Sequence, residues 1–245
     1  MKNLLTLCAG LLFCGSVIAD NHMPAQPVVF GQYYSIVVSD PAAVVEALQK
    51  YRASETGQKM QSGVTLSQNV ANGALAGTHS INVFYPSPEV MDATMRLASG
   101  SSDAAEFQQA MRGAATLESE NLFTMLISKV NREGMENPAS MLFGLNVTDQ
   151  AAFMKALNKL LDSGAAAEFP GNMFFGQIIA MGDTEGTHWV SFQAATVGAL
   201  LSGVDAFMKS SDFAAYAKNA DSFREVTSRM VSRQVLTLQP PSASN

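Results

Sequence analysis

The chain has 245 residues and a formal net charge of −6, and only 15% of its residues are charged. Nucleic acids and anionic lipid surfaces require basic patches, so this acidic composition excludes both as partners. The sequence also has no Gly-rich phosphate loop, no Gly-x-Ser-x-Gly elbow and no His-Glu-x-x-His motif, which argues against nucleotide and hydrolase chemistry.

Residues 1–19 have the pattern of a secretory signal peptide. Lys2 forms a short basic region, and the apolar run that follows it is too short to span a bilayer. We expect cleavage after Ala19, export to the periplasm or medium of a Gram-negative bacterium, and no membrane insertion afterwards. Both cysteines, Cys8 and Cys14, lie in this segment, so the mature chain has no disulfide and no thiolate ligand. Lipidation at Cys14 is disfavoured because a large residue precedes it.

Cleavage after Ala19 would leave Asp20-Asn21-His22 at the mature N-terminus. A free amine, two backbone amides and the imidazole of His22 can surround Cu(II) or Ni(II) in a square plane of nitrogens, a donor set that suits these ions. The sequence therefore predicts a metal-binding N-terminus, on condition that the mature chain begins at Asp20.

The sequence of the mature chain predicts an internal duplication, with two copies of one structural unit. A single shift of 109 residues aligns 33–127 with 142–236 without a gap, and it places "VSDPAAVVEALQK" (38–50) on "VTDQAAFMKALNK" (147–159). The repeats are predicted at 28–130 and 141–238, joined by a polar linker at 131–140 and followed by a flexible tail at 239–245.

Each repeat has the same predicted order of elements. A strand (33–39; 141–148) leads to a helix capped by Asp40 or Asp149. Two strands follow (64–71 and 78–85; 173–181 and 187–194). Next comes a helical stretch broken at Ser101-Ser102-Asp103 or Ser210-Ser211-Asp212, and then a last strand (121–129; 229–238). This βαββαβ order predicts an α+β fold of two tandem ferredoxin-like units, packed sheet against sheet as an intramolecular pseudo-dimeric α/β barrel.

Two fused units of this kind, each with its second helix broken near Ser-Ser-Asp, resemble the dimeric α/β-barrel superfamily. That superfamily includes antibiotic-biosynthesis-monooxygenase-like proteins, stress-responsive barrel proteins, haem-degrading monooxygenases and chlorite dismutase-like proteins. The resemblance implies a ligand cavity between helices and sheet, and it does not by itself imply an activity.

His79 and His188 are the candidate catalytic residues, because each follows Gly-Thr at the start of a repeated strand. Strand alternation puts each histidine in phase with the more apolar positions, which we expect to face the helices. Either histidine could transfer a proton in a helix–sheet cavity. The alternative is structural: Thr and His at a strand start hold the turn by hydrogen bonds.

Gln68, Gln177, Phe174 and Phe192 are the candidate ligand-binding residues. The two glutamines repeat in mid-strand and could present an amide to a ligand or pair across the sheet. The second repeat has the aromatic-richer cavity, with Phe174, Phe175, Trp189 and Phe192, which favours that half as the functional one. Asn82 and Trp189 are further polar candidates, each present in one repeat only.

Haem is disfavoured because the predicted helices carry no histidine to serve as axial ligand, and the methionines show no copper-binding array. We expect no cofactor. The sequence best fits an exported barrel protein, a monomer or weak homodimer, that binds a small apolar or aromatic molecule without turnover. The alternative is a cofactor-independent monooxygenase-like enzyme acting on a lipophilic substrate, with His79 or His188 in proton transfer.

Overall fold

The computed structural model describes residues 29–181 and 186–241. Its strands are β1 (Val29–Val38), β2 (Gly63–Ala71), β3 (His79–Tyr85), β4 (Ala115–Val130), β5 (Ala139–Val147), β6 (Gly171–Met181), β7 (His188–Ala194) and β8 (Arg224–Leu238). Its helices are α1 (Pro41–Ala53), α2 (Pro88–Ala98), α3 (Ser102–Ala114), α4 (Gln150–Leu161), α5 (Gly164–Ala167), α6 (Val197–Lys209) and α7 (Ser211–Ala217), with 3-10 turns η1 (Gly57–Lys59) and η2 (Ala220–Ser222). The predicted signal peptide and the Asp20-Asn21-His22 motif lie outside the described residues.

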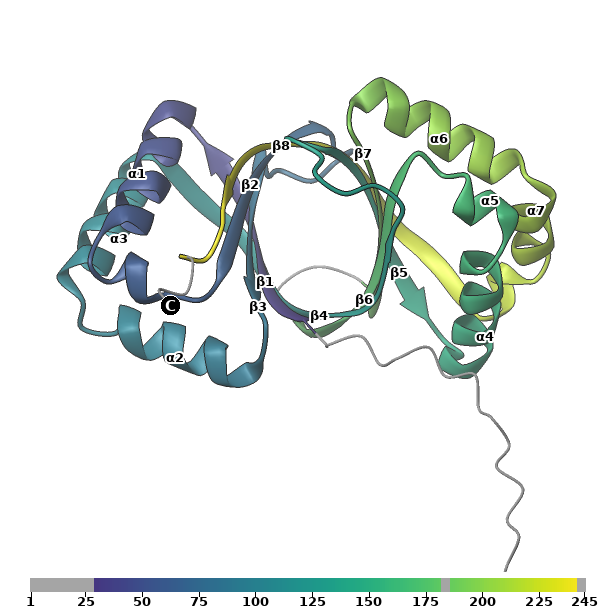
Figure 1. Ribbon diagram of the computed structural model, residues 1–245, viewed down its shortest axis with the longest axis horizontal. Coiled ribbons are helices and arrows are strands. Elements are labelled where there is room, and N and C mark those ends of the chain that lie inside the picture. The colour runs from purple at the N-terminus through teal and green to yellow at the C-terminus, as the bar shows by residue number, and fades with distance from the viewer. Residues whose placement is uncertain (1–28, 182–185, 242–245) are drawn as a thin grey trace, which may run out of the picture.

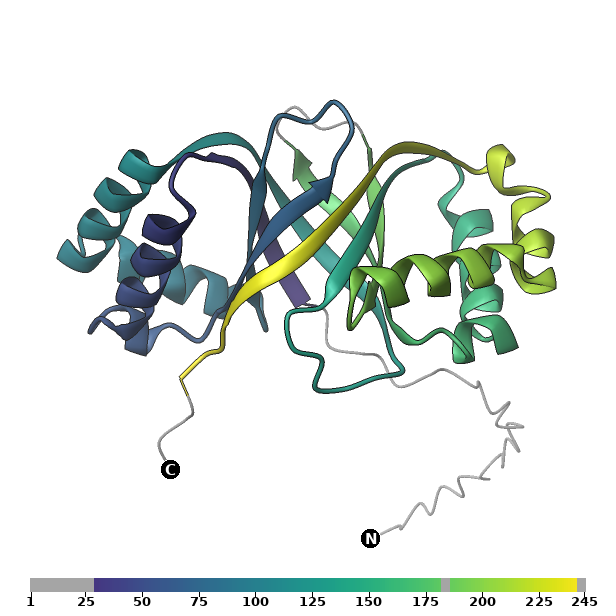
Figure 2. The same cartoon turned by 90° about the horizontal axis from the view of Figure 1, so that it is seen from above.

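Over these ranges the eight strands form one closed antiparallel barrel in the order β1-β3-β2-β8-β5-β7-β6-β4. Figure 1 looks down the barrel and shows α1–α3 on one side and α4–α7 on the opposite side. Figure 2, seen from above, shows the same two groups of helices flanking the strands. The described helices are all too short or too polar to cross a membrane.

The two halves of the barrel pair their strands in the same register after a shift of 109 residues. Phe30 pairs with Tyr85 between β1 and β3, and Ala139 pairs with Ala194 between β5 and β7. Around the barrel, each half contributes its strands in the sequence last, first, third, second. The β2–β8 and β4–β6 ladders join the halves. Residues 109 apart therefore occupy corresponding positions in the two halves.

The predicted helix starts are confirmed. The Asp40 carboxylate accepts a hydrogen bond from the Ala43 amide, and the Asp149 carboxylate accepts one from Ala152, each at 3.0 Å. Ser101 caps α3 and Ser210 caps α7 by the same kind of bond, so the second helical stretch is broken where predicted. Strand β4 ends at Val130 and β5 begins at Ala139, so residues 131–138 connect the two halves.

The more apolar strand phase faces the helices, as predicted. Ile81 and Val83 of β3 lie in one core cluster with side chains of α1 and α3, whereas Val190 and Phe192 of β7 lie in a cluster with α6. The opposite phase faces the barrel interior. There the Phe123 ring lies edge-to-face with the rings of Phe84 and Trp189, at centroid distances of 6.0 and 5.4 Å.

Gly176 leaves the room that this interior packing needs. A Cβ at position 176 would overlap the Thr124 carbonyl oxygen and the Trp189 ring. We expect Gly176→Ala to lower the free energy of unfolding by about 3 kcal/mol, because the closed barrel cannot shift one strand alone. Chemical denaturation of the purified protein measures this change.

Gly113, near the end of α3, is the matched control, because a Cβ there meets nothing within 4 Å. We expect Gly113→Ala to stabilise the protein by up to about 1 kcal/mol through helix propensity. Equal stability of the two variants would contradict the packing described for Gly176.

Candidate functional site

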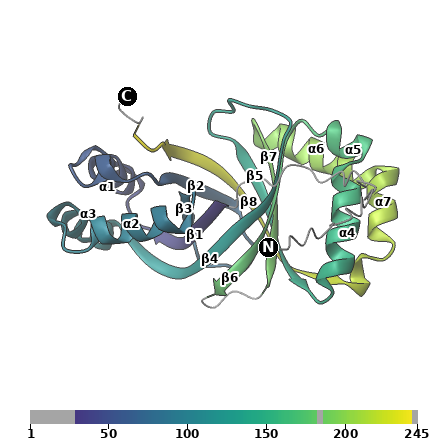
Figure 3. The same ribbon diagram turned by 60° about the horizontal axis from the view of Figure 1, so that its bottom comes forward.

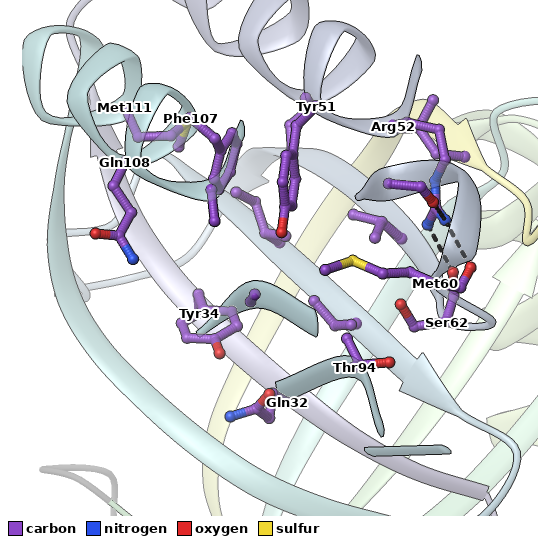
Figure 4. Close-up of a pocket in the computed structure, with 18 of the residues that line it drawn as sticks. Gln32, Tyr34, Tyr51, Arg52, Met60, Ser62, Thr94, Phe107, Gln108 and Met111 are labelled. Carbon is purple, nitrogen blue, oxygen red and sulfur yellow. Dashed lines mark hydrogen bonds between the residues drawn. The ribbon is translucent and has the colours of Figure 1, made fainter. Parts of the chain in front are cut away.

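The first half of the chain encloses a cavity of about 640 Å³ between its helices and the outer face of the barrel. Residues of β1, β2 and β3 form its floor, and residues of α1, α2 and α3 form its walls and roof. Figure 4 shows the side chains that project into it, and Figure 3 shows α2 lying across β3 on this side of the barrel. A volume of this size falls in the range of sites for drug-sized molecules.

The corresponding space in the second half is nearly filled, with only about 20 Å³ left. Four phenylalanine rings pack against one another there, with centroid distances between 5.4 and 6.4 Å: Phe169, Phe192, Phe207 and Phe213. The first half has a smaller or more slender side chain at each of the four corresponding positions: Met60, Val83, Ala98 and Ala104. The first half therefore has space between its helices and the sheet where the second half has phenylalanine rings.

The larger cavity thus lies in the first half, whereas the sequence favoured the aromatic-rich second half as the functional one. Phe174 and Phe192, predicted to bind a ligand, line the small residual space of the second half instead. The Phe192 ring belongs to a packed core and is 9% exposed, whereas Phe174 is partly buried. The phenylalanine rings of the second half therefore leave little space between its helices and the sheet.

The cavity floor carries three polar side chains, Gln32, Tyr34 and Tyr85. The Tyr85 hydroxyl donates to the Gln32 amide oxygen at 2.7 Å, and the Tyr34 hydroxyl also hydrogen-bonds to the Gln32 side chain. Burial is the main cause that raises the pKa of Tyr34 to about 12, and it raises the pKa of Tyr85 as well. Both phenols are therefore uncharged at neutral pH.

The polar floor belongs to the first half alone. The positions that correspond to Gln32, Tyr34 and Tyr85 hold the apolar side chains listed here: Met141, Phe143 and Ala194. These three residues were not predicted as site candidates from the sequence. The signal that marks them is a polar residue in one repeat that aligns with an apolar residue at the corresponding position of the other.

Arg52 also lines the cavity, but backbone carbonyls engage its guanidinium. It donates to the carbonyl oxygens of Gly57 at 3.3 Å, Met60 at 3.1 Å and Ser62 at 2.6 Å, and Figure 4 shows Arg52 turned toward this segment. Burial lowers the pKa of Arg52. Its role in the fold is to hold the loop after α1, which carries Met60 into the cavity.

The wall and entrance of the cavity are mostly apolar. The rings of Tyr51 (α1) and Phe107 (α3) stack at 4.8 Å with an angle of 15°, and the Tyr51 hydroxyl points into the cavity in Figure 4. Helix α2 buries none of its side chains, in contrast to α6, which buries four residues. Met95 and Leu117 are 45% and 54% exposed while still lining the cavity, which places them at its entrance.

The two histidines lie outside the residues that line the cavity. His79 Nδ1 is 3.0 Å from Thr78 Oγ1, and His188 Nδ1 is 2.8 Å from Thr187 Oγ1. Each threonine hydroxyl also accepts a hydrogen bond from a backbone amide at the end of the first strand of its half: Val38 of β1 for Thr78, and Val147 of β5 for Thr187. This geometry supports the structural alternative, and the catalytic role stays a prediction.

The remaining candidates lie away from the cavity as well. Gln68 is exposed near the end of β2, and Gln177 pairs in register with His188. Asn82 and Trp189 lie in the strand phase opposite to the histidines, facing the barrel interior. Within the described ranges, no three or more His, Cys, Asp or Glu side chains gather into a metal-binding group. His22 lies outside those ranges.

The sequence matches no family model, and no curated protein resembles it at a significant level. Solved structures resemble its fold. A proposed monooxygenase from Lactobacillus acidophilus superposes with a TM-score of 0.57 at 16% identity, over 88% of this chain and 97% of that chain. One from Fusobacterium nucleatum gives a TM-score of 0.59 at 12% identity, over 89% and 96%. An anthrone oxidase-like protein gives 0.55 at 10% identity, over 90% and 98%.

At these identities the likeness shows the fold alone. The predicted resemblance to dimeric α/β-barrel proteins is thus confirmed as a shared barrel architecture. Because these structures are matched over nearly their whole length, the likeness extends across both halves of the chain.

The burial of the histidines predicts a pH dependence of stability. Burial lowers the pKa of His79 and His188, so the unfolded chain takes up these protons first as the pH falls. The contribution of the two neutral histidines to the free energy of unfolding is complete above the ordinary histidine pKa of about 6.5 and is lost as the pH falls below it. We expect the free energy of unfolding of the double variant His79→Gln, His188→Gln to change less between about pH 7 and pH 5 than that of the unaltered protein.

Denaturant unfolding of both proteins across this pH range measures the effect. An unchanged pH dependence in the double variant would show that other groups cause it. Ligand binding in the cavity should be unaffected at pH 7, because neither histidine lines it.

Proposed function

We propose that this chain is an exported protein that binds a small, uncharged, aromatic or apolar molecule in the cavity of its first half. One observation carries the proposal: on a backbone repeated in register, one half is filled with phenylalanine and the other encloses about 640 Å³. If the first half had merely lost aromatic side chains, the space left behind would have apolar walls only. The polar side chains of Gln32, Tyr34 and Tyr85 on the floor are instead what a ligand site needs to orient its ligand.

The architecture belongs to the same proposal. We infer two ferredoxin-like βαββαβ units that arose by duplication and now form a pseudo-dimer within one chain. The shared register, the corresponding caps and the common offset of 109 residues support this inference. Export rests on the signal-like residues 1–19 alone. A fused pair already supplies both halves of the barrel, so we expect a monomer or weak homodimer.

The chemistry of the lining favours an uncharged ligand. Among the described residues that line the cavity, none is Asp, Glu or His, and the Arg52 guanidinium is bound to three carbonyl oxygens. Arg112 also lines the cavity, but it is exposed on α3 and does not belong to the floor. Tyrosine hydroxyls and the amides of Gln32 and Gln108 are the neutral groups that can supply hydrogen bonds. A charged ligand would enter without a counter-ion on the floor, which is costly in a partly desolvated site.

The second candidate function is a cofactor-independent monooxygenase-like reaction on a lipophilic substrate in the same cavity. The names of the structural neighbours favour it: two are proposed monooxygenases and one is anthrone oxidase-like. The positions of His79 and His188 disfavour it, because a general base has to reach the proton it removes. We therefore place binding before turnover.

Filling the cavity tests the proposal. The double variant Val83→Phe, Ala98→Phe introduces the rings that the second half carries as Phe192 and Phe207. We expect it to fold and to bind the tricyclic hydrocarbon fluorene at least tenfold more weakly than the unaltered protein, because the rings occupy the ligand volume. Equilibrium dialysis with fluorene, whose own fluorescence reports its concentration, measures the dissociation constant.

Leu201→Phe is the matched control, because it adds a ring at a position of α6 that is 48% exposed and on the opposite side of the barrel. It should leave fluorene binding unchanged. Fluorene binding that survives the double variant at full strength would refute the assignment of this cavity. Failure of the unaltered protein to bind fluorene would count against an apolar ligand.

A further inference from the structure

The polar floor of the cavity points to a specific feature of the ligand. We propose that Tyr85, Gln32 and Tyr34 form a hydrogen-bond relay that leaves the Tyr34 hydroxyl as a donor for one uncharged acceptor oxygen, such as a ketone carbonyl, on an otherwise apolar ligand. This inference rests on the proposed binding function and adds to it the chemical group that is recognised.

The first step of the relay fixes the orientation of an amide. The Tyr85 hydroxyl has only one hydrogen, and it donates this to Gln32 Oε1 at 2.7 Å. Tyr85 is 3% exposed and therefore has little access to water as another partner. The Gln32 amide is thus held with its oxygen toward Tyr85 and its Nε2 hydrogens toward the remaining floor.

The second step makes Tyr34 a donor. Hydrogen bonding by the Gln32 side chain lowers the pKa of Tyr34, which is the effect of a group that donates to the phenol oxygen, and with Oε1 engaged by Tyr85 the donor is the amide nitrogen. A phenol oxygen that accepts this bond keeps its own hydrogen for another partner. Figure 4 shows Tyr34 and Gln32 next to each other on the floor, with the apolar walls above them. A ligand in the cavity can be that partner, because Tyr34 is one of the lining residues.

The third step concerns charge. Tyr34 lies opposite Glu120 on the neighbouring strand β4, and the Glu120 carboxylate is one of the causes that raise the Tyr34 pKa. A negative charge beside the donor disfavours an anionic ligand oxygen at the same place. A phenolate or carboxylate ligand therefore fits this floor less well than a neutral carbonyl.

The second half shows that the fold does not require the relay. Its corresponding residues, Met141, Phe143 and Ala194, are apolar, although the strands pair in the same register. A buried polar trio that the architecture can replace by apolar side chains is best explained by a binding role. The same comparison supplies conservative substitutions for a test: Tyr34→Phe and Gln32→Met copy the second half.

The probes are fluorenone and fluorene, two rigid tricyclic molecules of nearly equal shape that differ by one carbonyl oxygen. We expect the unaltered protein to bind fluorenone about tenfold more tightly than fluorene, the effect of roughly one net hydrogen bond. Tyr34→Phe should abolish this preference by weakening fluorenone binding alone. Gln32→Met should reduce it in the same direction, which provides a second variant if one folds poorly. Isothermal titration calorimetry gives both dissociation constants.

Tyr33→Phe is the matched control. Tyr33 is the neighbouring residue of β1, but its hydroxyl bonds to Ser35 and Ser80 in the barrel rather than in the cavity. It should keep the full preference for fluorenone. Fluorene carboxylate, an anionic probe, should bind more weakly than fluorene.

The outcomes separate this inference from the proposed function. Equal binding of fluorenone and fluorene by the unaltered protein would overturn the relay and leave the apolar cavity in place. A Tyr34→Phe variant that weakens both probes equally would show a structural role and also overturn it. Binding of neither probe would remove the proposed function, and the relay with it.

Discussion

Closure of the barrel is the constraint on which the rest of the structure depends. Each described strand is paired on both sides, including the two seams β2–β8 and β4–β6 between the halves. A shift of backbone in one half would break hydrogen bonds in the other, so the main chain is fixed for both halves together. The halves can therefore differ in their side chains and in the helices outside the barrel, where α3 has 13 residues and α7 has 7, but not in the pairing of their strands.

Side-chain volume is the difference that matters most. In the second half, a cluster around Phe207 fills the space between helices and sheet, and each buried phenylalanine contributes roughly 1.5–3 kcal/mol to folding. The first half has Ala98 at the corresponding position and forgoes that contribution. A natural protein tolerates such a loss where a site needs the space, and the well-packed half supplies compensating stability.

The sequence predicts much of the frame and little of the site. Caps such as Asp40 and Ser101, and the two-residue alternation of His79, Ile81 and Val83, are local signals, so element order and strand phase could be foreseen. Whether an aromatic residue lines a cavity or fills it depends on its neighbours in space. Phe192 illustrates this: its ring is packed among rings from other elements, and no local pattern reports that packing.

The cavity orients its occupant by hydrogen bonds rather than by charge. Tyr34 and Tyr85 stay protonated because burial raises their pKa values, and Arg52 is bound to the loop that it holds. Hydrogen bonds from neutral groups contribute little net affinity, but a wrong ligand leaves them unsatisfied at a larger cost. On the proposed function, such a site would bind a broad apolar body with modest strength and discriminate through its neutral polar groups. The second half has apolar side chains at the positions of Gln32, Tyr34 and Tyr85, so the strand pairing of the barrel does not depend on these polar groups.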